Sequence, residues 1–404
     1  MNLATEKTFF TIVIPTRERS NTLMHAIATA ITQNYENFEV LISDNASLDD
    51  TRNKVESQED SRIKYINTGR RVSMSENWEF ALNHVSNGWV TVLGDDDGIL
   101  PGTLRYVDQL IRKTKVKAIR SNGCSYIWPD LIGQPNGSLS ISKQRGVVIK
   151  NSAEMLQKTL DGKSHYTELP VLYNGGFIST DLINKVKEIS GKMFLSMSPD
   201  VYSGIVFSFL TDEYAYCYEP LAINGASAHS GGTANFEKTK RKRDYDPAEK
   251  FLSEPNIPFH SSLPLSHDGR PVRSIPVIVY ETFLQAQAFH KFKNIMVSKE
   301  KQAAIALDQS GPKHDEIIDW SEQFIKKHQL NVSLVSSSRR GFFSKKYNKI
   351  HNIIRKIMNF ATSIHVKGND QVPLTNVFEA SIVGGFIKKI QPSTFKNIKL
   401  YFMG

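Results

Sequence analysis

The sequence predicts an α/β fold in which a mostly parallel sheet carries helices on both faces. Short apolar runs alternate with helical patterns over residues 9–121, and acidic turns follow two of the apolar runs. This alternation is typical of parallel sheets, because parallel neighbours are joined by crossovers that usually contain a helix. The chain has 404 residues, more than one ordinary domain, and its apolar fraction of 40% is enough for a packed core.

The expected strands are apolar runs bounded by polar turns, and helical patterns separate them. The strands are FFTIVIP (9–15), FEVLIS (38–43), RIKYIN (62–67), WVTVL (89–93) and VKAIRS (116–121). The helices cover a stretch from Ser20, a short segment near Asp50–Ser57, residues 73–86 and residues 101–113. Leu23, Ile27 and Ile31 form the apolar face of the first helix, and Trp78 lies on the apolar stripe of the third.

The rest of the chain follows a different pattern. Residues 122–235 mix extended pieces with helices near 151–160 and from 199 to 210. Residues 236–276 contain a basic run and several prolines, which predicts a linker or an excursion from the fold. Residues 277–404 are expected to form a largely helical and basic C-terminal region.

The formal net charge of +9 is concentrated in the C-terminal tail. Residues 331–404 hold 12 Lys and Arg against Asp370 and Glu379, so the first 330 residues sum to about −1. This distribution argues against a nucleic-acid-binding core, and it predicts a tail that contacts an anionic surface.

Residues 341–363 predict an amphipathic helix with a basic polar side. Its apolar stripe either packs on the rest of the chain or lies in the interface of an anionic membrane. We expect the second, with peripheral attachment to the cytoplasmic leaflet, so that truncation near Ser338 would release the protein and spare its activity. Two cysteines, and no run of the roughly 20 apolar residues that a membrane span needs, favour a cytoplasmic location.

Two acidic turns, Asp44–Asp50 and Asp95–Asp97, directly follow expected strands. Ligands of parallel α/β sheets bind beyond the carboxyl ends of the strands, so the two turns are expected to meet at one site. No Walker A, G-x-G-x-x-G, H-E-x-x-H or C-x-x-C pattern is present, which leaves oxygen-ligand chemistry and favours Mg²⁺ or Mn²⁺. The alternative is a solvated acidic loop without a ligand.

The strand ends IPTRER, ISDNASLDDT and VLGDDDGILP occur in an order that resembles the inverting family 2 glycosyltransferases of the GT-A fold. Members carry an acidic turn after the second strand and a D-x-D-like cluster ahead of a proline. SPDVYSG (198–204) looks like the later segment that carries the catalytic base of the family. GASAHSGG (225–232) is similar to a segment of O-antigen sugar transferases related to abequosyltransferases.

The resemblance covers about residues 8–235. It implies a GT-A nucleotide-diphospho-sugar transferase domain over residues 1–235, with a donor half at about 8–121 and an acceptor half at about 122–235. The chain is then expected to be a metal-dependent inverting transferase. It would move a sugar from a nucleotide-sugar donor to a glycan or a polyprenyl-diphosphate-linked acceptor, in the synthesis of a bacterial surface polysaccharide such as O-antigen or capsule.

The resemblance also assigns roles to the residues of the acidic turns. Those expected to contact the donor are Thr16, Arg17, Asp44, Asn45 and Asp95. Asp96 falls at the metal position, Asp97 would hold the metal or its waters, and His229 is either a further metal ligand, a contact to the diphosphate or a surface residue. Arg70 and Arg71 either pair with the diphosphate or are solvated loop residues.

Asp200 is the expected general base that takes the proton of the acceptor hydroxyl. The alternative is a capping role, because Asp is common in the first turn of a helix.

Three positions depart from the family pattern and leave the nucleotide base open. Many relatives have an aromatic residue at the position of Arg17, Asp at that of Asn45 and Arg at that of Glu76.

Three other functions stay open at this point. A nucleotidyltransferase that makes sugar nucleotides would need a glycine-rich loop after the first strand, and IPTRERSN contains no glycine. A glycoside hydrolase also uses paired carboxylates, although it needs neither a nucleotide-binding pattern nor a metal. A non-enzymatic basic adaptor for membranes would explain the tail but not the first 235 residues.

Overall fold

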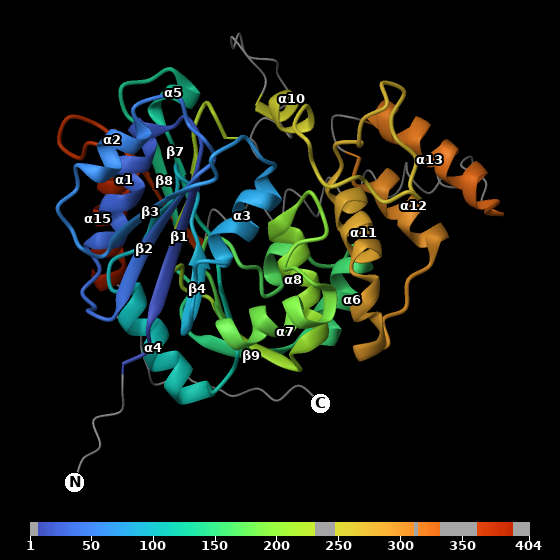
Figure 1. Cartoon of the computed structure of the whole chain (residues 1–404), viewed down its shortest axis with the longest axis horizontal. Helices are drawn as coiled ribbons and strands as arrows, with labels where there is room; N and C mark the ends of the chain where they lie inside the picture. The colour runs from blue at the N-terminus through green and yellow to red at the C-terminus, as the bar shows by residue number, and fades with distance from the viewer. Residues whose placement is uncertain (1–6, 231–246, 311–313, 332–361, 391–404) are drawn as a thin grey trace.

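The computed structural model describes residues 7–230, 247–310, 314–331 and 362–390 (Figure 1). Within these residues the main sheet has eight strands in the order β3-β2-β1-β4-β10-β6-β11-β9. A smaller sheet has the order β13-β8-β7-β12-β5.

The first part of the chain confirms the predicted alternation of strands and helices. Its elements are β1 (Phe10–Thr16), α1 (Ser20–Ile31), β2 (Phe38–Asp44), α2 (Thr51–Glu56), β3 (Ile63–Asn67), α3 (Met74–Leu82), β4 (Trp89–Val92), β5 (Gly98–Ile99), α4 (Thr103–Thr114) and β6 (Ala118–Ser121). β1 pairs in parallel with β2 and β4, and β2 pairs in parallel with β3. α3 begins with a capping box, in which Ser73 and Glu76 exchange hydrogen bonds.

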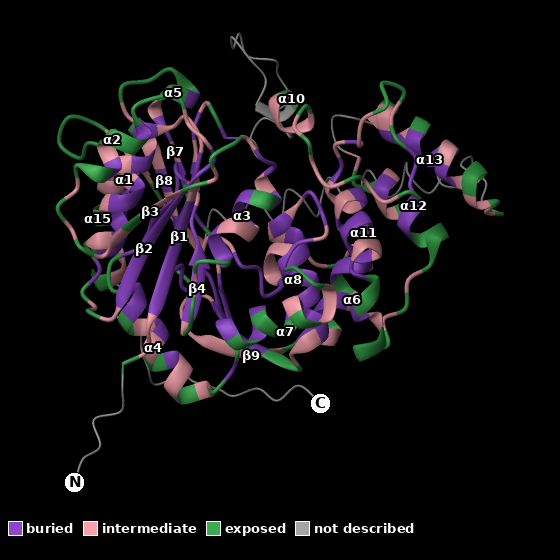
Figure 2. Ribbon diagram, viewed as in Figure 1, coloured by how far each residue is buried: buried purple, intermediate pink, exposed green. Residues whose placement is uncertain are grey.

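Side chains of β1 alternate between two cores, because successive residues of a strand point to opposite faces. Phe10, Ile12 and Ile14 belong to the core that α1 and α4 cover. Val13 lies in the opposite core together with Trp78 of α3. Helices therefore cover both faces of the sheet, and Figure 2 shows the central strands buried between them.

The second half of the main sheet is partly antiparallel. β10 (Gly176–Ser179) is inserted between β4 and β6 and runs antiparallel to both. β9 (Val147–Asn151) runs antiparallel to β11 (Glu213–Cys217), which in turn is parallel to β6. The smaller sheet consists of β5, β7 (Cys124–Ile127), β8 (Ser138–Ser142), β12 (Ala222–Ala226) and β13 (Ser363–Lys367).

The remaining helices frame the acceptor half and the C-terminal region. They are α5 (Pro129–Ile132), α6 (Ser152–Leu160), α7 (Thr180–Ser190), α8 (Pro199–Leu210), α10 (Pro247–Leu252), α11 (Ile275–Gln285), α12 (Lys299–Asp308), α13 (His314–His328) and α15 (Val377–Ile390). α6 and α8 confirm two predicted helices, and α11–α13 confirm the helical character of this stretch. α11 packs on α8, so the helices after residue 275 extend the core of the acceptor half.

The end of the described chain returns to the first half of the molecule. β13 pairs antiparallel with β8, and α15 packs against α1 and β5. Figure 1 shows α15 beside α1. The sequence did not predict this return, and the domain boundaries at residues 235 and 276 stay predictions. Nearly all of the predicted helix 341–363 lies outside the described residues. Among the helices that are described, none is both long enough and apolar enough to cross a bilayer.

Candidate active site

The parallel strands β1, β2 and β4 end at one edge of the main sheet, and the predicted site residues lie in the turns that follow them. Asp95, Asp96 and Asp97 come after β4 and have exposed fractions of 5%, 5% and 0%. Buried carboxylates need compensation by hydrogen bonds or positive charge. Their burial excludes the alternative of a solvated acidic loop.

Asp95 is held by the turn after β1. Thr16 Oγ1 donates to Asp95 Oδ2 at 2.8 Å, and Arg19 Nη1 donates to Asp95 Oδ1 at 2.8 Å. The same Arg19 nitrogen lies 3.7 Å from Asp96 Oδ2, and Arg19 Nη2 donates to the carbonyl of His229. Arg19 therefore places one positive charge beside two carboxylates and connects the β1 turn to the loop after β12.

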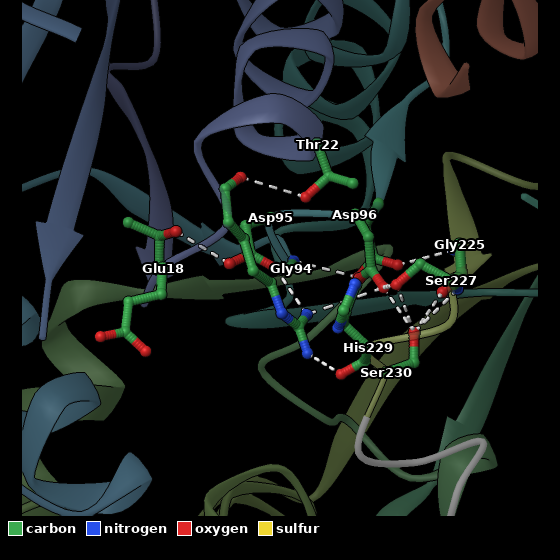
Figure 3. Close-up of polar contacts among 12 residues, drawn as sticks. Glu18, Thr22, Gly94, Asp95, Asp96, Gly225, Ser227, His229 and Ser230 are labelled. Atoms are coloured by element: carbon green, nitrogen blue, oxygen red, sulfur yellow. Dashed lines mark hydrogen bonds and ion pairs between the residues drawn. The ribbon is translucent and has the colours of Figure 1, made fainter. Parts of the chain in front are cut away.

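Asp96 contacts the loop after β12, as Figure 3 shows. Ser227 Oγ donates to Asp96 Oδ2 at 2.6 Å, and the hydroxyl of Ser230 donates to the same oxygen. Trp128 Nε1 donates to the backbone carbonyl of Asp96 at 2.8 Å. The structure thus brings the predicted segment around His229 to the triple-aspartate turn.

Asp97 is bonded on both oxygens by the protein. Its Oδ1 accepts from the Gly225 amide at 2.7 Å, and its Oδ2 accepts from the Gly94 amide at 3.0 Å and from Tyr173 Oη at 2.7 Å. These bonds fix the turn against β12 and against the loop that carries Tyr173. The expected contact of Asp97 with the metal or its waters stays a prediction.

The three carboxyl groups of the acidic turn can carry more negative charge than the single guanidinium of Arg19 neutralises. Burial raises the pKa of Asp95, an effect that the charge of Arg19 opposes. Burial, and then the charge of Asp96, raises the pKa of Asp97 to about 7. Carboxylates in such surroundings are stabilised in their ionised form by a nearby cation.

The donor set at this turn suits a hard divalent cation. Asp95 and Asp96 supply carboxylate oxygens. A hard divalent cation prefers oxygen ligands, so it needs no nitrogen or sulfur ligand from the residues around it. Among residues 7–230 and the other described ranges, no three His, Cys, Asp or Glu side chains come together as a complete metal site. Mg²⁺ commonly needs only one or two protein carboxylates, because waters and substrate phosphates fill the remaining positions. The residues fit such an ion, and His229 as a ligand stays a prediction.

Asp44 and Asn45, at the end of β2, organise the neighbouring loops. Asp44 accepts from the Ser47 hydroxyl at 2.5 Å and from Tyr65 Oη at 2.6 Å. The Asn45 amide donates to the carbonyl of Val72 at 2.8 Å and accepts from the Val72 amide at 2.9 Å. Both side chains are buried, so they shape the edge where the donor is expected.

The predicted donor-contacting arginines take part in ion pairs or lie in solvent. Arg17 pairs with Glu254, a residue that lies just after α10. Arg71 pairs with Glu18, which Lys250 also approaches at 3.2 Å. Arg70 is exposed. Arg17 thus connects the donor edge to the segment around α10 directly, and Arg71 does so only through Glu18 and Lys250. Contact with a diphosphate stays a prediction for all three arginines.

Asp200 lies in the first turn of α8 and is partly exposed. Its Oδ2 accepts from Tyr166 Oη at 3.0 Å, and Tyr166 belongs to the short 3-10 helix η1 (Tyr166–Glu168). The N-cap of α8 is Ser198, whose side chain makes no capping bond, and Asp200 is the acidic residue of the first turn. The helix-stabilising alternative for Asp200 and its role as the base both stay predictions. Burial raises the pKa of Asp200, and hydrogen bonds from the Val201 amide and the Tyr166 hydroxyl, together with the Arg120 charge, lower it. A carboxylate with a raised pKa beside an opening is suited to act as a base.

Arg120 connects the surroundings of Asp200 with those of Asp97, because it bonds backbone carbonyls of a segment that contacts both. Its Nε donates to the Thr167 carbonyl at 2.7 Å, and its Nη1 donates to the carbonyls of Tyr173 and Asn174 at 2.6 and 2.8 Å. The segment that it holds carries Tyr166, which bonds Asp200, and Tyr173, which bonds Asp97.

Sequence reasoning missed several residues of the site. They are Arg19, Arg120, Tyr166, Tyr173, Ser227 and Ser230. Arg19, Ser227 and Ser230 lie inside motifs that the sequence had singled out, so their proximity to the predicted residues was an available signal. Arg120, Tyr166 and Tyr173 belong to segments without a motif, and only the tertiary structure identifies them.

Comparisons with known proteins point to one family. Residues 11–128 match the family model described as "Glycosyl transferase family 2". The chain is 30% identical over 132 residues to the GalNAc(5)-diNAcBac-PP-undecaprenol beta-1,3-glucosyltransferase of Campylobacter jejuni, an alignment that covers 32% of this chain and 40% of that protein. It is 27% identical over 111 residues to the UDP-Glc:alpha-D-GlcNAc-diphosphoundecaprenol beta-1,3-glucosyltransferase WfgD of Escherichia coli, covering 28% and 44% of the two chains. The chain thus spans less than half the length of these relatives.

Solved structures give broader but weaker alignments. S. aureus TarS in complex with UDP aligns with a TM-score of 0.44 at 13% identity, over 79% of this chain and 91% of that chain. The mannosyltransferase PcManGT from Pyrobaculum calidifontis, in complex with GDP-Man and Mn²⁺, aligns with a TM-score of 0.41, over 96% and 88% of the two chains.

Proposed function

We propose, from the premise that residues 11–128 form a family 2 glycosyltransferase domain, that this chain transfers a sugar from a nucleotide-sugar donor to a hydroxyl group with inversion. The observation that carries the proposal is the meeting of three segments at one sheet edge. The end of β1 and the turn after it contact the buried carboxylate of Asp95, and the loop after β12 contacts that of Asp96. A transferase of this kind needs such an edge to hold a nucleotide and its diphosphate.

The donor would lie along the ends of β1, β2 and β4. Thr16, Asp44 and Asn45 border the space for the nucleoside, and Asp95 the space for its ribose. Asp96, with Asp95 beside it, would hold Mg²⁺ or Mn²⁺. When bound, this cation would stabilise the negative charge that develops on the departing diphosphate.

Asp200 would act on the acceptor. A bond forms between the acceptor oxygen and the anomeric carbon while the bond from that carbon to the diphosphate oxygen breaks, and the hydroxyl proton passes to the Asp200 carboxylate. The Tyr166 hydroxyl, 3.0 Å from Oδ2, orients this carboxylate. Attack from the face opposite the leaving diphosphate gives inversion.

The proposed acceptor is a glycan on a polyprenyl diphosphate, in the synthesis of a bacterial surface polysaccharide. This part of the proposal is supported by the names of the two relatives, which include diphosphate-linked undecaprenol glycans. The basic C-terminal tail, including residues 341–363, would bring the protein to the anionic inner face of the plasma membrane.

The test is a screen of nucleotide sugars for release of the nucleoside diphosphate, with Mn²⁺ or Mg²⁺ and with chelator. We expect one donor to be turned over, with activity lost in chelator. Asp96→Asn should reduce metal-stimulated turnover by about a hundredfold or more, because it removes a charged oxygen from the cation site. Full activity of the wild-type chain in chelator would rule out the metal, and turnover of no donor with any acceptor would rule out the transferase.

A further inference from the structure

A cavity of about 1060 Å³ lies outside the sheet edge, between the irregular segment after α10 and the last turns of α13. Its apolar lining consists mainly of Met197, Leu252, Ile257, Phe259, Leu263 and Leu265. Leu265 is 39% exposed, so this apolar wall is accessible from the solvent. A cavity of this size is at the upper end of the range that small-molecule sites occupy.

Two residues of its wall connect the cavity to the two halves of the proposed active site. Met197 on its wall precedes α8, whose first turn carries Asp200. A smaller neighbouring cavity shares Met197 and Phe259 with it and adds Ser198, the N-cap of α8. On another side its wall includes Glu254, which pairs with Arg17 at the end of β1. In Figure 1, α10 lies between the strand-rich part of the molecule and α13.

The wall also carries positive charge. Lys326 and Lys327, in the last turn of α13, line the cavity and are exposed. Lys327 Nζ donates to the carbonyl of Ser261 at 2.7 Å and so holds the loop against the helix. Among the described residues that line the cavity, Glu254 is the one with a carboxylate, and Arg17 pairs with it. Lysines at a helix C-terminus also complement the helix dipole, but this does not account for the apolar wall beside them.

An apolar wall next to lysines matches an amphiphile with an anionic head. From this juxtaposition we propose that the cavity binds the prenyl-diphosphate end of a lipid-linked acceptor. Lys326 would contact the diphosphate, and Leu265 and Phe259 would contact the first isoprene units. The acceptor sugar would then extend past Met197 toward Asp200. This inference rests on the proposed function, since it locates the acceptor of that same reaction.

The test measures binding of farnesyl diphosphate to the full-length protein by calorimetry, with farnesol and inorganic diphosphate as separate ligands. Farnesyl diphosphate should bind at least about tenfold more tightly than farnesol or inorganic diphosphate, because the apolar residues and the lysines of the cavity both contribute to its binding. Lys326→Gln should weaken binding of farnesyl diphosphate about tenfold and leave farnesol unchanged. Leu265→Asn should weaken both prenyl ligands. Lys185→Gln, at an exposed position on α7, is the matched control and should change neither.

The outcomes separate this inference from the proposed function. Unchanged binding in both cavity variants, or displacement of farnesyl diphosphate by excess nucleoside diphosphate, would overturn the cavity assignment. If nucleotide sugars are turned over while farnesyl diphosphate does not bind, the inference is wrong and the transferase stands. If farnesyl diphosphate binds as expected and no donor is turned over, the cavity assignment stands and the transferase is wrong.

Discussion

Arg120 is a buried arginine whose partners are backbone carbonyls rather than a carboxylate. Arg120→Met would leave the carbonyls of Thr167, Tyr173 and Asn174 without this donor in a buried place. Each unmet polar group costs about 1–3 kcal/mol, so we expect the free energy of unfolding to fall by about 3 kcal/mol or more. Turnover should fall as well, because the freed segment carries the partners of both Asp97 and Asp200. Denaturant titration and donor turnover measure the two effects.

The control for this prediction is Arg52→Met. Arg52 forms a surface pair with Glu56 at i, i+4, and its side chain is 68% exposed. Such pairs contribute about 0.5 kcal/mol or less. Equal unfolding free energies of the two variants would show that the bonds of Arg120 do not hold the site.

The pH dependence of turnover tests the bond between Tyr166 and Asp200. Asp200 accepts a proton only when ionised, so turnover should fall as the pH drops through its pKa. Burial raises this pKa, and the hydrogen bond from Tyr166 lowers it. Tyr166→Phe removes one of the contributions that lower the pKa of Asp200, so the acidic limb of the kcat profile should move to higher pH.

Asp200→Asn should reduce kcat by about a hundredfold at every pH, with the acidic limb lost. Tyr35→Phe is the matched control, because the Tyr35 hydroxyl bonds the Thr8 carbonyl and does not contact the site. If the acidic limb of Tyr166→Phe coincides with that of the wild-type chain, Asp200 is not the base that the profile reports.

At the scale of elements, β12 lies so close to the acidic turn that position 225 has no room for a side chain. A Cβ atom at Gly225 would lie 1.8 Å from the backbone carbonyl of Asp96, while the Gly225 amide donates to Asp97. Gly225→Ala must therefore separate β12 from the turn. We expect a destabilisation of about 1–3 kcal/mol, as for overpacked cores, together with a loss of donor affinity. Thermal melts with and without the donor measure both.

Gly123→Ala provides the comparison, since a Cβ atom there meets nothing within 4 Å. The prediction fails if Gly225→Ala binds the donor as tightly as Gly123→Ala does.

The strands and helices of the first 121 residues were predictable because each is long and periodic enough to read locally. β1 and β2 are mainly apolar and are buried along nearly their whole length, as expected for strands that helices cover on both sides. The smaller sheet was not predictable. β5 has two residues, and β13 pairs with β8 across more than 200 residues of sequence, so no local pattern identifies either partner.

The candidate site was predictable to the extent that its residues follow strands. Asp95 and Asp96 come directly after a strand, and the parallel order alone places them with Thr16 at one edge. Tyr173 and Arg120 could not be found in this way, because their contribution depends on hydrogen bonds between distant segments.

At the scale of the whole molecule, the C-terminal region is not a detachable tail. β13 extends the smaller sheet, and α15 covers the turn that follows the three aspartates. Truncation near Ser338 would remove both elements and so would not test the tail alone, and the expectation that it spares activity stays a prediction. Membrane attachment through residues 341–363 is better tested by replacing the lysines and arginines of that range, with binding to anionic vesicles at low and high salt as the readout.

α15 presses two glycines against the segment that leads out of the acidic turn. A Cβ atom at Gly384 would lie 2.7 Å from Leu100 Cδ2, and one at Gly385 would lie 2.8 Å from Pro101 Cγ. Beneath them Gly98–Ile99 of β5 pairs with β12, the strand that carries Gly225. A displacement of α15 should therefore reach the donor edge through β5 and β12.

We expect Gly385→Val to lower the unfolding free energy by about 1–3 kcal/mol and to weaken donor binding, because the added side chain forces α15 away from Pro101. Ile382→Val is the matched control on the same helix, at a side chain that is 53% exposed and should tolerate the change. Denaturant titration and donor titration of the two variants measure the effects side by side. If Gly385→Val loses stability while its donor affinity matches that of Ile382→Val, α15 stabilises the fold without supporting the site. If it loses neither, the close contact between α15 and the turn is absent in solution.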